Sequence, residues 1–267
     1  MNPKSCEALL LCLRSVLRSR APSLSARLLR ALAGMNDPRK AALYLGTRVR
    51  SLPPETIAAV LQGFFDGVER REPGSDLAVE ALLCEEMRSA WPEGLSLQVQ
   101  ACARRERDFD LAGMLLELPE MDSRFMPAVS RLPKDLQEVP LGVRKAWARQ
   151  GDVFLMDRLL SDPDPAVVAN LLDNPRLMPR DVIRLASRTD AGEEVLLLVA
   201  THRRWISRYP VKVTLAHNPS TPMRITLGLL HLLMSPDLRE LVAVGRVSGV
   251  VAGRAKELLR VRDGRAG

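Results

Sequence analysis

The segment THRRWISRYPVKV (201–213) brings together side chains suited to binding a partner. Arg beside Trp and Tyr is typical of binding hot spots and of surfaces on which nucleic-acid bases stack. An alternative reading makes Trp205 an inter-helix core residue whose arginine neighbours are merely solvated. The residues predicted to bind a partner are Arg203, Arg204, Trp205, Arg208, Tyr209 and Lys212.

Nothing else in the sequence has the spacing of a catalytic or metal site. His202, His217 and His231 have no carboxylate or cysteine at metal-ligand spacing, so we expect structural or surface roles. Glu85 and Glu86 are adjacent, and adjacent helical residues point in different directions, so they cannot readily flank one substrate. Nucleophile-elbow, P-loop, zinc-protease and dinucleotide-binding motifs do not occur. We therefore expect no enzymatic activity and no cofactor.

The four cysteines indicate a reducing compartment. Cys6, Cys12, Cys84 and Cys102 fit neither a metal knuckle nor a dense disulfide framework. Cys12 and Cys84 stand among apolar residues and are expected to be small buried hydrophobes. We predict a cytoplasmic protein without a membrane span. The Arg- and Ser-rich start resembles an organelle transit peptide, but an ordinary first helix is the preferred interpretation.

Prolines mark where the helices begin and end. A capping residue followed by proline and an apolar run is a helix-start signature, because the side chain accepts from an unpaired backbone N–H and proline lacks one. Asn174-Pro175 and Asn218-Pro219 instead end the preceding runs. We expect helices of about 8–14 residues that depend on packing against neighbours. The predicted starts are Asp37-Pro38, Asp164-Pro165, Thr221-Pro222 and Ser235-Pro236.

Composition and charge favour an all-α, basic protein. Hydrophobic residues make up 46% of the chain but aromatics only 4%, which suits small helices better than sheets. The net charge of +7 is uneven: 1–50 and 201–267 each carry +8, while 51–100 carry −6 and 151–200 carry −4. Positive ends can indicate nucleic acid or an anionic membrane, although an arginine-rich composition alone also gives them.

Two pairs of segments recur at the same spacing. DFDLAGMLLELPE (108–120) aligns with DVFLMDRLLSDPD (152–164), and the two Asn-Pro units lie equally far apart, at an offset of 44. Two pairs giving one period indicate a helical repeat array. No clean register extends through the N-terminal 100 residues.

The run DPDPAVVANLLDNPRLMPRDVIRLASRTD (162–190) resembles a leucine-rich repeat variant or HEAT-type unit, and 209–242 resembles the units that follow. The resemblance implies an α-solenoid of short stacked helices. It suggests degenerate repeats over 1–104, HEAT-like repeats over 105–260 and a C-terminal tail over 261–267. Some leucine-rich repeat variant proteins carry an iron–sulfur cluster on clustered cysteines, but the cysteines here are dispersed.

Two functions remain open at this stage. The first is a non-enzymatic scaffold for protein–protein interaction, because solenoids commonly bind other proteins in a long groove. The alternative is a nucleic-acid-binding solenoid resembling the HEAT-like DNA glycosylases. The basic ends favour the alternative, and the acidic segments oppose it.

Overall fold

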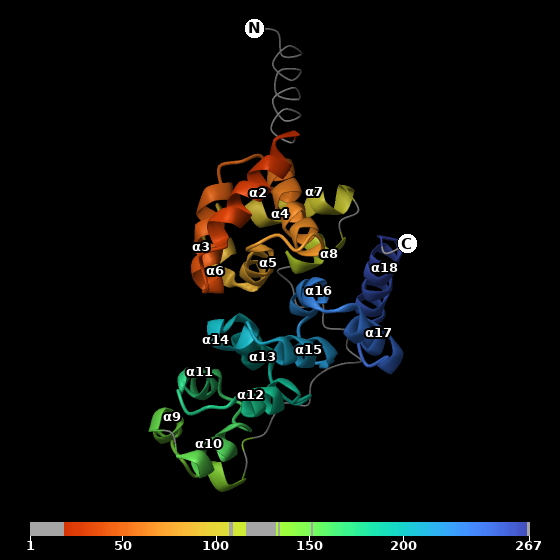
Figure 1. Ribbon diagram of the computed structural model, residues 1–267. Helices are drawn as coiled ribbons and strands as arrows, with labels where there is room; N and C mark the ends of the chain where they lie inside the picture. Colours follow the sequence, from red (N-terminus) through yellow and green to blue (C-terminus); the bar gives the residue numbers. More distant parts are fainter. Residues whose placement is uncertain (1–18, 107–108, 116–131, 133, 151, 266–267) are drawn as a thin grey trace. The chain divides into compact units, whose positions relative to one another are not determined.

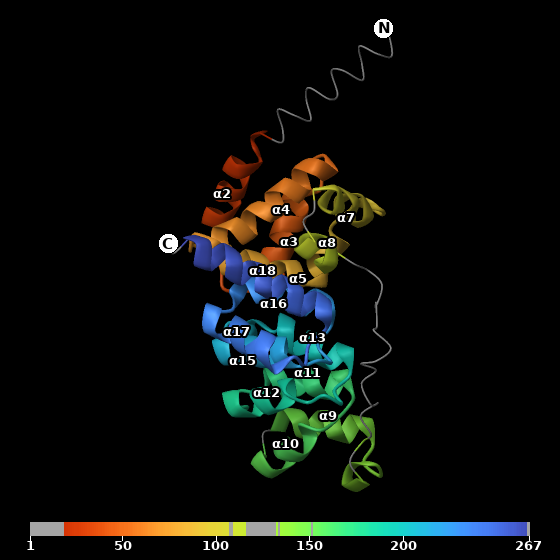
Figure 2. The ribbon, with the colours of Figure 1, turned by 90° about the vertical axis from the view of Figure 1, so that its right-hand side faces the viewer.

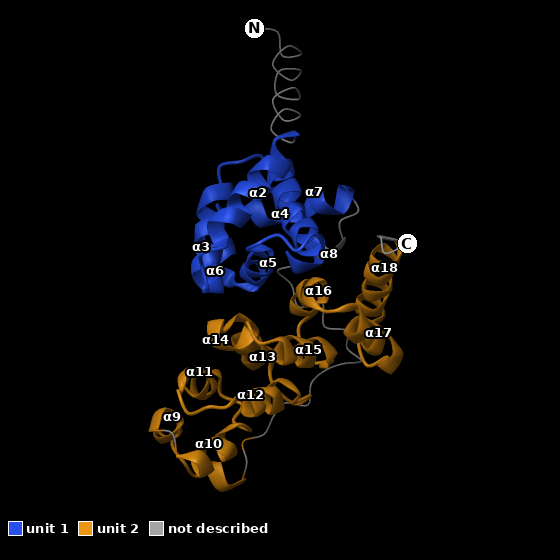
Figure 3. Ribbon diagram, in the orientation of Figure 1, with its two compact units in different colours: residues 1–117 blue, residues 118–267 orange. Residues whose placement is uncertain are grey.

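The computed structural model describes residues 19–106, 109–115, 132, 134–150 and 152–265. Its regular structure is helical, and none of these residues forms a strand, so the all-α prediction is confirmed for them. The chain divides into two compact units, Met1–Glu117 and Leu118–Gly267 (Figure 3). The predicted N-terminal helix, Cys6 and Cys12 lie outside the described residues, as do 108 and 116–120 of the first repeat pair.

The first unit is a cluster of helices around α4 (Pro54–Glu69) (Figure 1). The others are α2 (Ala21–Leu32), α3 (Pro38–Val49), α5 (Ser75–Leu83), α6 (Glu85–Ser89), α7 (Leu95–Arg105) and α8 (Phe109–Met114). α4 packs against α2, α5, α7 and α8. Its inward face carries Ile57, Leu61, Phe64 and Phe65, each at most 2% exposed. That i, i+4, i+7, i+8 spacing gives the helix one continuous apolar stripe.

The unit boundary differs from the predicted one between 104 and 105. That position falls at the end of α7, and α8 still packs against α7 and α4. The first unit therefore extends to Glu117.

Gly74 sets the approach of α5 to α2. Its φ is +84°, a conformation that residues with a Cβ rarely adopt, and a Cβ there would lie 2.3 Å from the Leu29 carbonyl oxygen. Gly94, before α7, has a φ of +76° but no atom within 4 Å of the corresponding position. The first glycine is required for both backbone conformation and close packing, and the second for conformation alone.

Short helices follow one another through the second unit, as Figures 1 and 2 show. They are α9 (Leu141–Gln150), α10 (Val153–Leu159), α11 (Pro165–Asp173), α12 (Pro179–Ala186), α13 (Glu193–Thr201), α14 (Arg203–Ile206), α15 (Tyr209–His217), α16 (Met223–Leu232), α17 (Ser235–Val244) and α18 (Gly249–Arg265), preceded by the 3-10 helix η2 (Lys134–Leu136). Helices close in sequence pack together: α9 with α10 and α11, α11 with α13, and α15 with α16 and α17.

Several helix lengths depart from the sequence expectation: in the first unit α4 has 16 residues, α6 has 5 and α8 has 6. In the second unit α10 and α14 are shorter than predicted, with 7 and 4 residues, and α18 is longer, with 17. The longer α18 includes 261–265, so these residues belong to a helix that packs on α16 and α17 and not to a tail.

At the two predicted Asp-Pro helix starts the aspartate caps the helix as expected. Asp37 accepts from the backbone nitrogens of Arg39 and Lys40 at 3.0 and 3.3 Å. Asp164 does the same for Ala166 and Val167 at 2.9 and 3.3 Å.

The two hydroxyl residues do not cap the helices as predicted. Thr221 donates its hydroxyl to the Leu215 carbonyl at 2.7 Å, and Pro222 takes the cap position of α16. Ser235 is already the first residue of α17. A threonine or serine hydroxyl also donates, so it can bond to a carbonyl instead of capping, whereas an ionised carboxylate only accepts.

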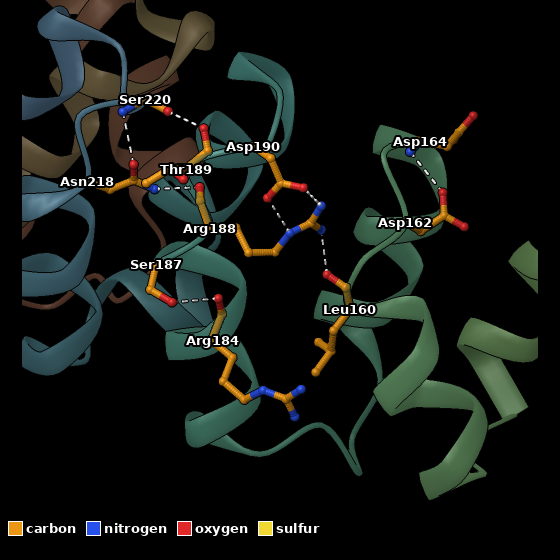
Figure 4. A network of polar contacts seen from close by, with 10 residues as sticks. All are labelled: Leu160, Asp162, Asp164, Arg184, Ser187, Arg188, Thr189, Asp190, Asn218 and Ser220. Carbon is orange, nitrogen blue, oxygen red and sulfur yellow. Dashed lines mark hydrogen bonds and ion pairs between the residues drawn. The ribbon is translucent and has the colours of Figure 1, made fainter. Parts of the chain in front are cut away.

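Asn174 and Asn218, 44 residues apart, make matching hydrogen bonds. Asn174 Nδ2 donates to the carbonyls of Ala148 and Arg149 at 2.7 and 3.3 Å, and its Oδ1 accepts from the Arg176 nitrogen at 2.9 Å. Asn218 Nδ2 donates to two carbonyls, at 2.7 and 2.8 Å, and its Oδ1 accepts from the nitrogen two residues later at 2.9 Å. Figure 4 shows Asn218 with Ser220 and Arg188. Each amide therefore closes its own turn and joins it to the end of an earlier helix.

Two arginines tie the beginning of this unit together. Arg144 on α9 pairs with the fully buried carboxylate of Asp162, whose other oxygen accepts from the Asp164 nitrogen at 2.9 Å. Arg188, after α12, donates to the Leu160 carbonyl at 2.7 Å and forms two hydrogen bonds to Asp190, at 3.1 and 3.0 Å (Figure 4). Arg188 thus links the end of α12 to the end of α10.

Candidate functional site

The ring of Trp205, the centre of the predicted binding cluster, is buried. Its exposed fraction is 0%, and Nε1 donates to the Leu172 carbonyl of α11 at 2.8 Å. The guanidinium carbon of Arg204 lies 4.3 Å from the ring centroid, and that of Arg208 lies 5.8 Å away. The predicted contact surface is corrected accordingly, because a ring in the core offers no stacking face to a partner.

Arg204 binds three backbone carbonyls just after the end of a neighbouring helix. It donates from Nη1 to the Asn174 carbonyl at 2.9 Å, and from Nη2 to the carbonyls of Pro175 and Leu177, both at 3.2 Å. These carbonyls come directly after the C-terminal end of α11. The C-terminal end of a helix leaves carbonyl oxygens without intrahelical partners and favours a positive charge nearby. His202 caps α14 by accepting from the Arg204 nitrogen at 3.3 Å.

Tyr209 is also partly buried and Lys212 is buried. The Tyr209 hydroxyl donates to the Asp237 carboxylate and accepts from the Met234 nitrogen at 2.8 Å. Burial, and then the hydrogen bond to Asp237, raise the pKa of the Tyr209 phenol. Lys212 is 7% exposed. Of the six predicted residues only Arg203 and Arg208 are exposed, so the cluster as a whole is not a surface patch.

The remaining chemical candidates take structural positions. Within the described ranges, no three His, Cys, Asp or Glu side chains lie where they could hold a metal ion. Cys84 and Cys102 are free thiols and buried, as predicted for Cys84. Burial raises the pKa of the Cys84 thiol to about 12, which makes it a poor nucleophile. Glu86 lies 3.6 Å from the Arg39 guanidinium and Glu85 is exposed, so this pair lies on a helix surface.

A groove of about 520 Å³ lies between α10 and α12 of the second unit. We call it the α10–α12 groove. Three of the residues that line it have large apolar side chains open to solvent: Phe154 is 84% exposed, Val153 62% and Met178 47%. Met156, Leu160 and Leu177 also line it and are at most 4% exposed, so they form an apolar floor.

The first turn of α10 explains why Phe154 is exposed. Asp152 caps this helix by accepting from the nitrogens of Phe154 and Leu155 at 2.9 and 3.4 Å. Met156, Leu159 and Leu160 form the inward face. Phe154 lies two positions before Met156, and two helical positions differ by about 200° around the axis. Phe154 therefore does not belong to the inward face, which leaves its ring exposed.

Charged side chains surround this apolar surface: four arginines and two aspartates, a formal charge of +2. Arg184 on α12 pairs with Asp157 on α10 across the groove, and Arg158 pairs with Asp135 of η2. The charged lining residues are Arg158, Arg176, Arg180, Arg184, Asp157 and Asp181.

Sequence reasoning missed this groove, although a weak signal was present. In DVFLMDRLL the repeat skeleton uses Asp152, Leu155, Leu159 and Leu160, and Phe154 falls outside it. One of only five phenylalanines in the chain thus stands off the apolar stripe of a short helix. Exposure of such a residue depends on what neighbouring helices cover, which the local pattern does not contain.

Among the helices of the described ranges, none combines the length and apolar character needed to cross a bilayer. No protein-family model, curated protein or solved structure matches the chain. What can be inferred of its function therefore rests on the α10–α12 groove and the helices that position it.

Proposed function

We propose that the chain is a non-enzymatic helical-repeat scaffold that binds another protein through the α10–α12 groove. The observation that carries this proposal is Phe154, 84% exposed beside an apolar floor. Burying a phenylalanine side chain contributes about 1.5–3 kcal/mol. Covering Phe154 together with Val153 and Met178 would therefore favour association, and an exposed aromatic and apolar cluster of this kind often marks an interaction site.

The α-solenoid arrangement is part of the same proposal. Its support is the matching hydrogen bonding of Asn174 and Asn218 at an offset of 44 residues. A repeated turn of this kind places successive helices in similar relations, so that neighbours share a continuous core and one side remains available for binding. The HEAT-like character of the repeats rests on the sequence resemblance.

The charged groups at the groove favour recognition over catalysis. An arginine side chain only donates hydrogen bonds, so the four arginines of the groove suit the binding of acceptor groups. One of its two aspartates, Asp181, accepts from the Met178 nitrogen at 3.0 Å and so stabilises the start of α12. The other, Asp157, pairs with Arg184.

A nucleic-acid-binding solenoid is the second candidate, because Phe154 and four arginines also suit a stacking surface. Two features favour a protein partner: the lining of the groove and the burial of Trp205. The other apolar residues that line the groove are aliphatic or Met, so the groove offers no second aromatic ring on which a base could stack. With Trp205 in the core, the cluster at 201–213 supplies no alternative platform.

A photocrosslinking experiment tests the proposal. Benzoylphenylalanine is placed at position 154, and in a control protein at Leu43, which is 53% exposed on α3. After irradiation in an extract of the source cells, we expect protein adducts at 154 that the position 43 control lacks. The crosslinked protein, purified, should bind the wild-type chain at least tenfold more tightly than Phe154→Ser. Equal adducts at positions 154 and 43, or equal binding of the crosslinked protein to the wild-type chain and to Phe154→Ser, would contradict the proposal.

A salt series separates the two candidates. Random-sequence single- and double-stranded oligonucleotides are titrated at 50 and 200 mM salt. Binding through phosphates would weaken steeply over that range, because counterions are released. We expect no such binding at the groove; binding that falls with salt and is lost in Phe154→Ser would support the nucleic-acid alternative instead.

A further inference from the structure

We infer that the α10–α12 groove takes a short acidic, amphipathic segment of its protein partner, with a few large apolar side chains flanked by carboxylates. This inference rests on the proposed function, because it names the chemistry of the partner that the groove would bind. Three features of the groove support it: its size, the distribution of charge around it, and exposed ion pairs whose aspartates a partner can replace.

The size of the groove suits a segment and not a folded surface. A volume of about 520 Å³ is within the range of concave sites that enclose small ligands, about 300–1,000 Å³. A few side chains fill such a space. Since Phe154 and Met178 project at its edge and Met156 and Leu177 form its floor, the side chains that enter must be apolar.

Positive charge is concentrated at the groove against the trend of the surrounding sequence. Residues 151–200 contain nine acidic residues and five arginines, a net charge of −4. Yet four of those five arginines line the groove, with only two of the nine acids. The fold has separated the charges, and the arginines gather around the one exposed aromatic side chain of this segment. An approaching carboxylate would be attracted here and an approaching lysine repelled.

The ion pairs at the groove are exposed enough for a partner's carboxylates to replace the aspartates in them. Arg184 and Asp157 have side chains 61% and 59% exposed, and Arg158 and Asp135 are similarly open. Such exposed pairs contribute about 0–1 kcal/mol each, so a carboxylate from a partner can replace the internal aspartate at little cost. The Arg180–Asp181 pair is loose, at 3.7 Å, and Asp181 is held by its bond to the Met178 nitrogen. Arginine also binds carboxylates through two parallel hydrogen bonds, which gives direction as well as affinity.

A selection from a display library of random 16-residue peptides tests this inference on the full chain. Peptides are selected on the wild-type protein and counter-selected on Phe154→Ser, a change at an exposed position whose folding is checked by circular dichroism. We expect the retained peptides to be enriched in Asp and Glu together with Leu, Phe or Met. Enrichment of basic residues, indifference to charge, or no retained peptide would overturn the inference.

A quantitative titration then examines the arginines with the best peptide and its carboxamide analogue, in which Glu and Asp become Gln and Asn. We expect the analogue to bind at least tenfold more weakly, and the wild-type peptide to bind Arg180→Glu/Arg184→Glu at least tenfold more weakly. A matched charge change in the first unit, Arg27→Glu/Arg50→Glu, should leave affinity within twofold. Equal losses in both double variants would indicate attraction to the overall charge and would refute a site at the groove.

Failure of this inference can be told apart from failure of the proposed function. If crosslinking at position 154 yields a protein partner but the peptides show no preference for acidic residues, the scaffold stands and the partner chemistry is wrong. If neither experiment gives a protein or peptide at position 154, both fail. Binding of phosphatidylserine vesicles or oligo(dT), lost in Phe154→Ser and without peptide binding, would replace the protein partner by a membrane or a nucleic acid.

Discussion

Arg203 and Arg204 are adjacent in sequence, and the same substitution at each should have very different consequences. Arg204→Met keeps the unbranched apolar stem but removes the donors that bind the carbonyls of Asn174, Pro175 and Leu177. It also removes the cation that lies 4.3 Å from the Trp205 ring centroid. Arg203→Met changes an exposed side chain of the same type.

The expected loss follows from these contacts. Arg204 is only partly buried and water can replace it at these carbonyls, so we take the net contribution of its three hydrogen bonds as about 1.5–3 kcal/mol, the value of one bond from a charged donor. A cation–π contact of this kind contributes about 1 kcal/mol. We therefore expect Arg204→Met to lower the free energy of unfolding by about 2.5–4 kcal/mol. For a domain of this size that corresponds to a fall in Tm of roughly 5–15 °C. Arg203→Met should cost less than about 1 kcal/mol, because interactions of exposed charged side chains contribute about 0–1 kcal/mol.

Urea unfolding followed by tryptophan fluorescence measures both variants. Because the two units can unfold in separate transitions, far-UV circular dichroism is recorded in parallel and each transition is fitted by itself. Equal stability of the two variants would refute the argument, since it would mean that Arg204 gains nothing from the carbonyls around it. A large loss in Arg203→Met would show that 203 is structural as well.

Three further predictions concern single residues. Asn218→Ala removes three hydrogen bonds of a buried amide and should cost about 2–4 kcal/mol in urea unfolding; a loss under 1 kcal/mol would show that water replaces the amide. Gly74→Ala should cost clearly more than Gly94→Ala, for which we expect about 1–2 kcal/mol, because both glycines have positive φ but only at 74 does a Cβ meet backbone within 3 Å; equal losses would argue against the close approach. Cys84, with a thiol pKa of about 12, should be thiolate in only roughly one molecule in ten thousand at pH 8, so it should react with iodoacetamide only after unfolding. Because this pKa is raised from 9.0, the contribution of Cys84 to stability is full below pH 9 and is lost as the pH rises towards 12; rapid alkylation of the native protein would contradict its burial.

Features that depend on neighbours within a few residues could be predicted from the sequence. Asp37 and Asp164 cap helices because each carboxylate reaches backbone nitrogens two and three positions ahead, next to a proline that lacks a donor. Asn174 and Asn218, which the sequence pairs at an offset of 44 residues, make matching hydrogen bonds, while the repeat array itself stays a prediction. Even there, Thr221 shows the limit: its hydroxyl donates to Leu215, a choice that the Thr-Pro pair does not reveal.

Tertiary structure decided whether Trp205 and Phe154, the two aromatic residues most relevant to function, are buried or exposed. Trp205 stands among arginines and suggested a surface, yet Leu172, 33 residues earlier, accepts its indole N–H in the core. Phe154 drew no prediction from the sequence, yet the neighbouring helices leave it exposed and make it part of the candidate site. Capping depends on three or four consecutive residues, which the sequence displays directly. Burial depends on which helix, often tens of residues away in the sequence, packs over the residue. The local sequence pattern does not identify that helix.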